Sequence, residues 1–299
     1  MAGRVLYRQV NKDHAYWTEK RAVGHVKGGH TSGLLTYVSE DGAVAENILI
    51  DAGLGTMEGL ADLADFSWEA PLKILITHSH IDHHAELLIL SEMWCNRMAP
   101  GGRRRGPVDV YCTGDPTTST LKRLINDHKH GFTKGSTLAH VPVMPGAPMP
   151  VGSIFTFTIQ AIENDHTTGA VNFVVEFGNE KRHKVIIGWD MKTPPSLSEY
   201  PLLTKPSLAL IEANTVTSVV PSHTSVEDLL RTSFLANLCA VRNPAEQRYG
   251  VYLVHYGGRE DSFGVLTDAD LLAEIYRRSP SLMGLVRVAS RGQTWTFAV

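Results

Sequence analysis

The residues best suited to chemistry stand in one short stretch, Thr77–His84, directly after the apolar run 72–76. It contains four imidazoles and one carboxylate, at His78, His80, Asp82, His83 and His84. Imidazole nitrogens and carboxylate oxygens are good ligands for borderline divalent metals, and the end of a strand holds them rigidly. The stretch therefore predicts a metal site rather than a solvated histidine-rich turn.

Three further ligand-type residues stand at the ends of apolar runs elsewhere in the chain. His166 lies between two such runs, and Asp190 and His255 each follow one directly. Independent strand ends can meet at one edge of a packed sheet, and ligands often lie in the loops there. Because the first stretch supplies at most half of a two-metal site, we expect these three residues to complete it.

The elements that must position these residues alternate between short β-branched runs and helical patterns. The predicted strands are 34–38, 47–51, 72–77, 108–112, 138–143, 154–162, 171–177, 185–189, 207–211, 251–255, 285–289 and 294–298. The predicted helices are 56–65, 85–98, 117–128, 226–240, 244–248 and 268–277. Gly and Pro interrupt the pattern at 100–107 and 141–152. No linker or repeat divides the chain, so we expect one layered α/β domain over residues 1–299.

The pattern His-x-His-x-Asp-His, followed by a His, an Asp and a His after later strands, resembles the metallo-β-lactamase fold hydrolases. The resemblance extends from residues 47–53 to His255. It implies an αβ/βα four-layer sandwich of two mixed β-sheets flanked by helices, with the site along their common edge. It also implies the ligands: His78, His80 and His166 for one ion, Asp82, His83 and His255 for a second, and Asp190 bridging both.

The implied chemistry is that of a dinuclear metal centre. Two ions can share a hydroxide that attacks the substrate, so no Ser or Cys nucleophile is required, and Asp82 becomes part of the catalytic centre. Five imidazoles and two carboxylates suit Zn²⁺ first, then Mn²⁺ or Fe²⁺. The chain departs from the family pattern at Asp165, where Gly usually precedes the third histidine, and at the bulky Trp189 beside Asp190. Both departures concern the shape of the pocket more than the number of ions.

Several neighbouring residues have two interpretations. Asp51 is either a turn residue or the acceptor for the second nitrogen of a ligand imidazole. For His84 we favour a supporting or helix-start role over ligation. His30 lies in a Gly-rich segment and either lines a pocket or is an ordinary loop residue. The segment Arg103–Arg105 is either a phosphate contact or a solvated loop, and its Gly/Pro-rich setting favours the loop.

The segment 221–230 indicates the reaction, because it contains His223 followed by Thr224. In the phosphodiesterase branch of the resembled family, which includes cyclic phosphodiesterases and tRNA 3′-processing endonucleases, a His-Thr/Ser motif precedes the last ligand. Its histidine contacts the scissile phosphate and protonates the leaving oxygen. His223 matches that position, and an imidazole suits proton donation because its ordinary pKa is near neutral. The alternative is that His223 and Thr224 only cap the following helix.

Within that branch we favour a small phosphodiester substrate, such as a cyclic nucleotide or a cyclic ribose phosphate. The tRNA-processing enzymes carry a long arm between the third histidine and the bridging aspartate, whereas little more than one hairpin separates His166 from Asp190. The net charge of −3 gives no basic field for nucleic acid or anionic lipid. Two alternatives stay open: hydrolysis of a thioester, lactone or β-lactam on the same fold, and a non-catalytic sensor that binds its ligand without turnover.

Bulk composition sets the remaining limits. A chain of 299 residues can bury a core without disulfides, and its three cysteines lack C-x-x-C spacing, as expected in a reducing compartment. The first residues contain no apolar signal region, and no apolar run reaches membrane-spanning length. We therefore expect a cytoplasmic protein without a membrane partner. A homodimer stays open, because members of the resembled family are often dimers but no apolar surface stripe demonstrates one here.

Overall fold

The computed structural model describes residues 3–11, 30–63, 66–96, 98–99, 103–113, 137–179, 182–217, 221–241, 250–255 and 268–299. The helices predicted over 117–128 and 244–248 lie outside the described residues, as do the side chains of Arg103 and Arg104. In the part of the chain that is described, no helix has both the length and the apolar character required to cross a membrane.

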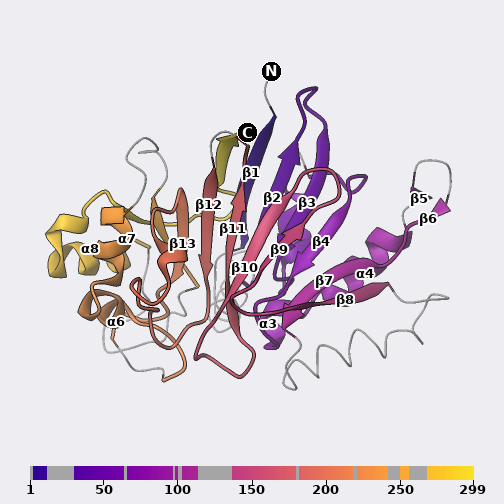
Figure 1. Cartoon of the computed structure of the whole chain (residues 1–299). Coiled ribbons are helices and arrows are strands. Elements are labelled where there is room, and N and C mark those ends of the chain that lie inside the picture. The colour runs from indigo at the N-terminus through magenta and orange to yellow at the C-terminus, as the bar shows by residue number, and fades with distance from the viewer. Residues whose placement is uncertain are drawn as a thin grey trace.

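Two seven-stranded mixed β-sheets form the centre of the molecule (Figure 1). Their strands are β1 (Arg4–Asn11), β2 (Ser32–Val38), β3 (Val44–Ile50), β4 (Leu72–Leu75), β7 (Val108–Thr113), β8 (Leu138–Val143), β9 (Pro148–Val151), β10 (Phe157–Glu163), β11 (Val171–Phe177), β12 (His183–Gly188), β13 (Leu208–Glu212), β14 (Val251–Val254), β15 (Val286–Val288) and β16 (Thr294–Ala298). The first sheet has the order β16-β1-β2-β3-β4-β7-β8, and the second has the order β15-β14-β13-β12-β11-β10-β9. A separate two-stranded ribbon joins β5 (Met98–Ala99) to β6 (Arg103–Arg104).

Helices lie on the outer side of each sheet (Figure 1). Those packed on the first sheet are α2 (Thr56–Ala61) and α4 (Leu87–Asn96), and the short helix α3 (Ile81–His84) precedes α4. Those packed on the second sheet are α6 (Val226–Arg231), α7 (Phe234–Val241) and α8 (Asp268–Arg278), with the short 3₁₀ helices η3 (Pro201–Leu203) and η5 (Pro280–Leu282) beside them. The predicted α/β four-layer sandwich of two mixed sheets flanked by helices is therefore confirmed.

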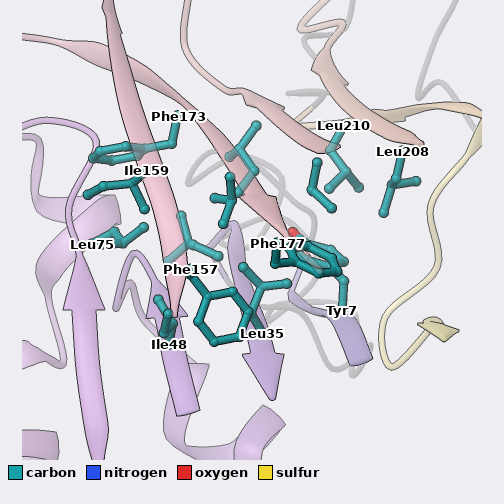
Figure 2. Packing of buried hydrophobic residues seen from close by; sticks show 14 of the residues in the cluster. Tyr7, Leu35, Ile48, Leu75, Phe157, Ile159, Phe173, Phe177, Leu208 and Leu210 are labelled. Carbon is teal, nitrogen blue, oxygen red and sulfur yellow. The ribbon is translucent and has the colours of Figure 1, made fainter. Parts of the chain in front are cut away.

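Alternation of side chains along the strands builds three apolar layers, because successive residues point to opposite faces of a sheet. In β3, Ile48 points between the sheets and Leu49 points outward to the helices. In β12, Ile187 points between the sheets and Ile186 points outward. Figure 2 shows the middle layer, where Ile48 of the first sheet and Phe157 of the second belong to one buried cluster. Sheets covered on both faces leave their strand ends as the place for polar chemistry.

The sequence pattern predicts neither the short ribbon strands β5 and β6 nor two strands of the large sheets, β1 and β9. Strand β1 lies between β16 and β2 and is buried on both faces, but its polar residues Arg8, Gln9 and Asn11 interrupt the apolar pattern. Strand β9 contains Pro148 and Pro150. Proline is tolerated there because β9 is the edge strand of its sheet, so no ladder hydrogen bond is lost on its outer side.

The single helix predicted over 226–240 is two helices in the structure. Helix α6 ends at Arg231, and α7 begins at Phe234. Between them Ser233 has a φ of 54°, a left-handed conformation that an α-helix cannot contain. The helix predicted over 85–98 corresponds to α4, and the histidine stretch itself forms the short helix α3 before it.

Candidate metal centre

The predicted site residues meet at one edge of the two sheets, beyond the ends of β4, β12 and β14. One set of ligand-type atoms, the three-histidine group, comes from His78, His80, His166 and Asp190. A second set, the two-aspartate group, comes from Asp82, His83, Asp190 and His255. Within each group these atoms lie within 4.8 Å of one another, and Asp190 belongs to both. The structure thus brings together all seven residues that the sequence pattern selects as ligands.

The three-histidine group has the dimensions of a four-ligand metal cage. Nδ1 of His80 lies 3.0 Å from Nε2 of His78 and 3.0 Å from Nε2 of His166. Oδ2 of Asp190 lies 3.1 Å from Nε2 of His78 and 3.7 Å from Nε2 of His166. Ligands at about 2.0–2.1 Å from a tetrahedral zinc ion are about 3.3 Å from one another. The four side chains therefore fit a divalent ion in size and in chemistry.

The two-aspartate group is more deeply buried. Nε2 of His83 lies 2.8 Å from Oδ2 of Asp190 and 3.6 Å from Oδ2 of Asp82. His255 approaches Oδ1 of Asp190 to 2.8 Å through Nδ1, and Oδ2 of Asp82 to 4.0 Å through Nε2. Among the described residues, Nε2 of His83 and both carboxylate oxygens of Asp190 have no hydrogen-bond partner, although all are buried. Buried polar atoms nearly always have a partner, so these converging atoms fit a bound cation.

Three residues at this edge share a left-handed backbone conformation. Asp51, Asp190 and His255 have φ angles of 57°, 47° and 55°. Each follows the end of a strand, β3, β12 or β14, within two residues. Aspartate and histidine are among the few non-glycine residues enriched in this conformation. The chain therefore leaves the sheet abruptly at these points, where the side chains gather at the edge.

Partners on the outer side of the cluster orient two of the imidazoles. Nδ1 of His83 donates to Asp51 over 2.5 Å, and Nδ1 of His166 donates to the carbonyl of Ser222 over 2.5 Å. Asp51 also accepts hydrogen bonds from the amide and the hydroxyl of Thr77. With their protons on Nδ1, both rings present the Nε2 lone pair to the ligand groups. Of the two interpretations of Asp51, the structure shows the acceptor.

Glu212 is a site residue that the sequence analysis missed. It is the last residue of β13 and is fully buried. Its Oε1 lies 2.5 Å from Nδ1 of His223 and 3.2 Å from Nδ1 of His255, and its Oε2 accepts a hydrogen bond from the amide of Met191. The signal was available, because a carboxylate at the end of an apolar run also identified Asp190. Glu212 directly follows the predicted strand 207–211, just as Asp190 directly follows the predicted strand 185–189.

His223 lies beside the cluster and is not a helix cap. Ser225 caps helix α6, and its side chain and that of Asp228 form a reciprocal capping box. The His223 ring lies 4.6 Å from the ring of His166 and 5.7 Å from that of His255, measured between centroids. The capping alternative for His223 is therefore wrong, because Ser225 does that work.

Burial and charge oppose each other in the protonation of the site. Burial lowers the pKa of His78 to about 3, which leaves the ring neutral and able to ligate. Burial also opposes the charged form of His83 and His255, but the carboxylate of Asp190 raises the pKa of both rings, that of His255 to about 10. Although burial favours its neutral form, Asp190 has a pKa well below its usual range because of these two rings. The buried carboxylate thus favours positive charge on the groups around it, which also suits a bound cation.

The pair formed by His223 and Glu212 is a second electrostatic unit. Burial would lower the pKa of His223, but the hydrogen bond and the charge of Glu212 raise it. Although burial favours its neutral form, Glu212 has a lowered pKa because of its bonds to His223 and His255. The arrangement therefore favours an imidazolium next to a carboxylate at neutral pH.

The other polar residues considered from the sequence lie outside both ligand groups. Nε2 of His84 contacts the carbonyl of Ser79 at 3.0 Å, which is a supporting role within the motif. His30 exchanges backbone and side-chain hydrogen bonds with Leu54. Arg105 pairs with Glu69 at 2.8 Å, near the start of β4 and thus at the opposite end of that strand from the site. Arg105 is therefore far from the site, but its side chain is not solvated, because it is 6% exposed and lies 4.9 Å from the ring centroid of Trp94.

Comparison with known proteins identifies the family. A model of the beta-lactamase superfamily domain matches residues 46–240, and no curated protein sequence matches the chain. Among solved structures, the chain is similar to the metallo-beta-lactamase fold protein YhfI from Bacillus subtilis, with a TM-score of 0.65 and 15% identity over 98% of this chain and 99% of that one. It is also similar to unliganded yeast PDE1, with a TM-score of 0.65 and 14% identity over 98% and 99% of the two chains. The short form of human tRNase Z, ELAC1, has a TM-score of 0.63 and 16% identity over 97% and 98%. The chain therefore belongs to the metallo-β-lactamase fold hydrolase superfamily.

Proposed function

We propose that the protein is a dinuclear metal-dependent hydrolase that cleaves a small phosphodiester. In this proposal His78, His80 and His166 hold one divalent ion, Asp82, His83 and His255 hold a second, and Asp190 bridges the two. Zinc suits these imidazoles and carboxylates first, and manganese or iron second. The observation that carries the proposal is the contact between His223 and Glu212 directly beside the ligand groups.

His223 is the proton donor in this proposal. Although burial lowers the pKa of the His223 ring, the hydrogen bond and charge of Glu212 raise it, which favours the protonated ring. A protonated imidazole can give that proton to the leaving oxygen of a phosphodiester, and such a donor typically contributes about 10²–10⁴ in rate. A thioester needs no such donor, because a thiolate leaves readily, whereas the alkoxide of a phosphodiester does need one, so this pair favours a phosphodiester over a thioester.

The remaining residues position the ligands. Two divalent ions, when bound, supply Lewis acidity and lower the pKa of water enough for attack at neutral pH. Asp51 holds His83 and the carbonyl of Ser222 holds His166, so that both rings keep one orientation. Glu212 fixes the Nδ1 edge of His223, which leaves the Nε2 edge of that ring facing away from Glu212.

The length of chain between two ligands supports a small substrate. Strands β11 and β12 form an antiparallel hairpin between His166 and Asp190, and they take up most of that segment. The segment between His166 and Asp190 is therefore too short to contain a protruding arm that could bind a folded RNA. The net charge of −3 agrees, because a polyanion would meet no basic field.

The test is metal analysis of the purified protein combined with a substrate panel. The panel contains bis-p-nitrophenyl phosphate, a cyclic nucleotide, a lactone and S-lactoylglutathione. We expect two zinc equivalents and turnover of the phosphodiesters alone. Activity confined to the acyl compounds would overturn the phosphodiesterase proposal, and binding of phosphodiesters without any cleavage would indicate a sensor instead.

A further inference from the structure

Three loops of the second sheet contribute residues to the site, and hydrogen bonds join these loops into a closed ring. We call them the His166 loop (164–170), the Asp190 loop (190–193) and the His223 loop (221–225). Nδ1 of His166 donates to the carbonyl of Ser222, which joins the first loop to the third. Oγ1 of Thr224 donates to the carbonyl of Met191 over 2.5 Å, which joins the third loop to the second.

Asp165 closes the ring. Its Oδ1 accepts hydrogen bonds from the backbone amides of Lys192, at 3.1 Å, and Thr193, at 2.9 Å. These bonds join the His166 loop to the Asp190 loop through one carboxylate oxygen. Asp165 directly precedes one ligand of the three-histidine group, and the two amides lie two and three residues after another ligand, Asp190.

We propose that Asp165 is a positioning residue that fixes His166 relative to Asp190 and thereby sets the affinity of the three-histidine group for its ion. The inference rests on the proposed function only in taking these residues as metal ligands. A charged acceptor bonded to two amides is stronger than a neutral one, and partners outside the ligand set control ligand orientation. The family pattern has Gly at this position. The hydrogen bonds to Asp165 are therefore a feature of this chain and not part of the pattern that identified its ligands.

The local contacts explain why a single side chain matters. Asn164 accepts the amide of His166 at 3.0 Å and donates to Asn172, which fixes the loop against its own hairpin. Within the described structure, those two bonds do not tie His166 to the Asp190 loop. Asn172 also reaches that loop, through a long contact of 3.9 Å from its Nδ2 to Sδ of Met191, and the shorter bonds come from Asp165 on one side of the ring and from Ser222 and Thr224 on the other.

The test compares zinc affinity in four forms of the full-length protein by competition with a chromogenic chelator. Asp165→Ala removes the acceptor, and Asp165→Asn keeps an oxygen that can accept both amides. Glu163→Ala is the matched control, because Glu163 is an exposed carboxylate two residues away, at the end of β10. We expect Asp165→Ala to weaken the binding of one zinc ion by about tenfold or more and to leave the binding of the other unchanged. Asp165→Asn should lose less than Asp165→Ala, and Glu163→Ala should bind both ions like wild type.

Two outcomes would overturn the inference: wild-type affinity for both ions in Asp165→Ala, or an equal loss in Glu163→Ala. Melting curves of the metal-free proteins show that each variant is folded. Asp165→Gly, which supplies the residue of the family pattern, is a second variant with the same expected loss if the Ala variant does not fold. If the wild-type protein binds zinc but cleaves no phosphodiester, the proposed reaction is wrong. The comparison of zinc affinities among the Asp165 variants stays valid in that case.

Discussion

The two sheets supply the candidate site in different ways. The first sheet supplies four ligand-type residues from one segment between β4 and α4: His78 and His80 precede helix α3, and Asp82 and His83 lie in it. Its geometry is local, since one turn of helix places Asp82 and His83 next to His80. The second sheet supplies single residues from separate connections, so strand order and contacts between the loops must bring them together.

The difference shows where the site is rigid and where it needs support. The stretch from the first sheet is fixed by its own backbone and by Asp51, which bonds both Thr77 and His83. The loops from the second sheet have no shared backbone, and hydrogen bonds between loops hold them, including those of Glu212 and Asp165. Asp190 joins the two halves, because it lies close to His78 and His83 from the first sheet and to His255 from the second.

The largest effect is therefore expected from Asp190→Asn, which removes the charge that joins the two halves. Both ligand groups lose their common carboxylate, and metal affinity should fall by more than the roughly 10–100-fold that loss of an outer partner costs. Elemental analysis after dialysis measures the change. Retention of a full metal complement would show that Asp190 is not needed to join the two halves of the site.

His223→Ala tests the second sheet alone. The substitution removes the proposed proton donor but no ligand, so kcat for a phosphodiester should fall by about 10²–10⁴ with metal content unchanged. Steady-state kinetics and elemental analysis of the same preparation measure both quantities. Loss of metal equal to that in Asp190→Asn would refute the separate roles of the two residues.

The contrast between local patterns and tertiary contacts also determines how much of the molecule can be predicted from the sequence. The strands 138–143, 171–177 and 294–298 are predicted with the observed bounds, because a continuous apolar or alternating run ends in clear turn signals. The motif of the first sheet is visible as a local pattern. Strand β1 is not predicted because buried polar residues interrupt its apolar pattern, and β9 is not predicted because it contains two prolines.

The second half of the site is only partly predictable. The rule that a ligand-type residue follows an apolar run finds His166, Asp190 and His255. Applied to the run 207–211, the same rule would also have found Glu212. The left-handed conformations and the bond from Asp165 to the Asp190 loop depend on tertiary contacts, so no local pattern contains them. The ligand assignments and the single domain over 1–299 stay predictions.

Asp51→Asn tests the support of the first sheet. An amide at this position can donate to Nδ1 of His83, which would move the ring proton to Nε2, the atom that faces Asp190. A protonated Nε2 cannot ligate, so affinity for the ion of the two-aspartate group should fall by about 10–100-fold. Chelator competition measures this, and an unchanged affinity for that ion would show that Asp51 only shapes the turn.

Glu212→Gln should have the smallest effect and tests how the second sheet tunes its donor. Burial lowers the pKa of His223, and the bond and charge of Glu212 raise it. Activity that needs the protonated ring is present below this pKa and is lost as pH rises through it. Without the charge, the alkaline limb of the profile of kcat against pH should move to lower pH, with a loss of about tenfold above neutrality. An unshifted alkaline limb would mean that the proton comes from another group, and that Glu212 only holds the amide of Met191.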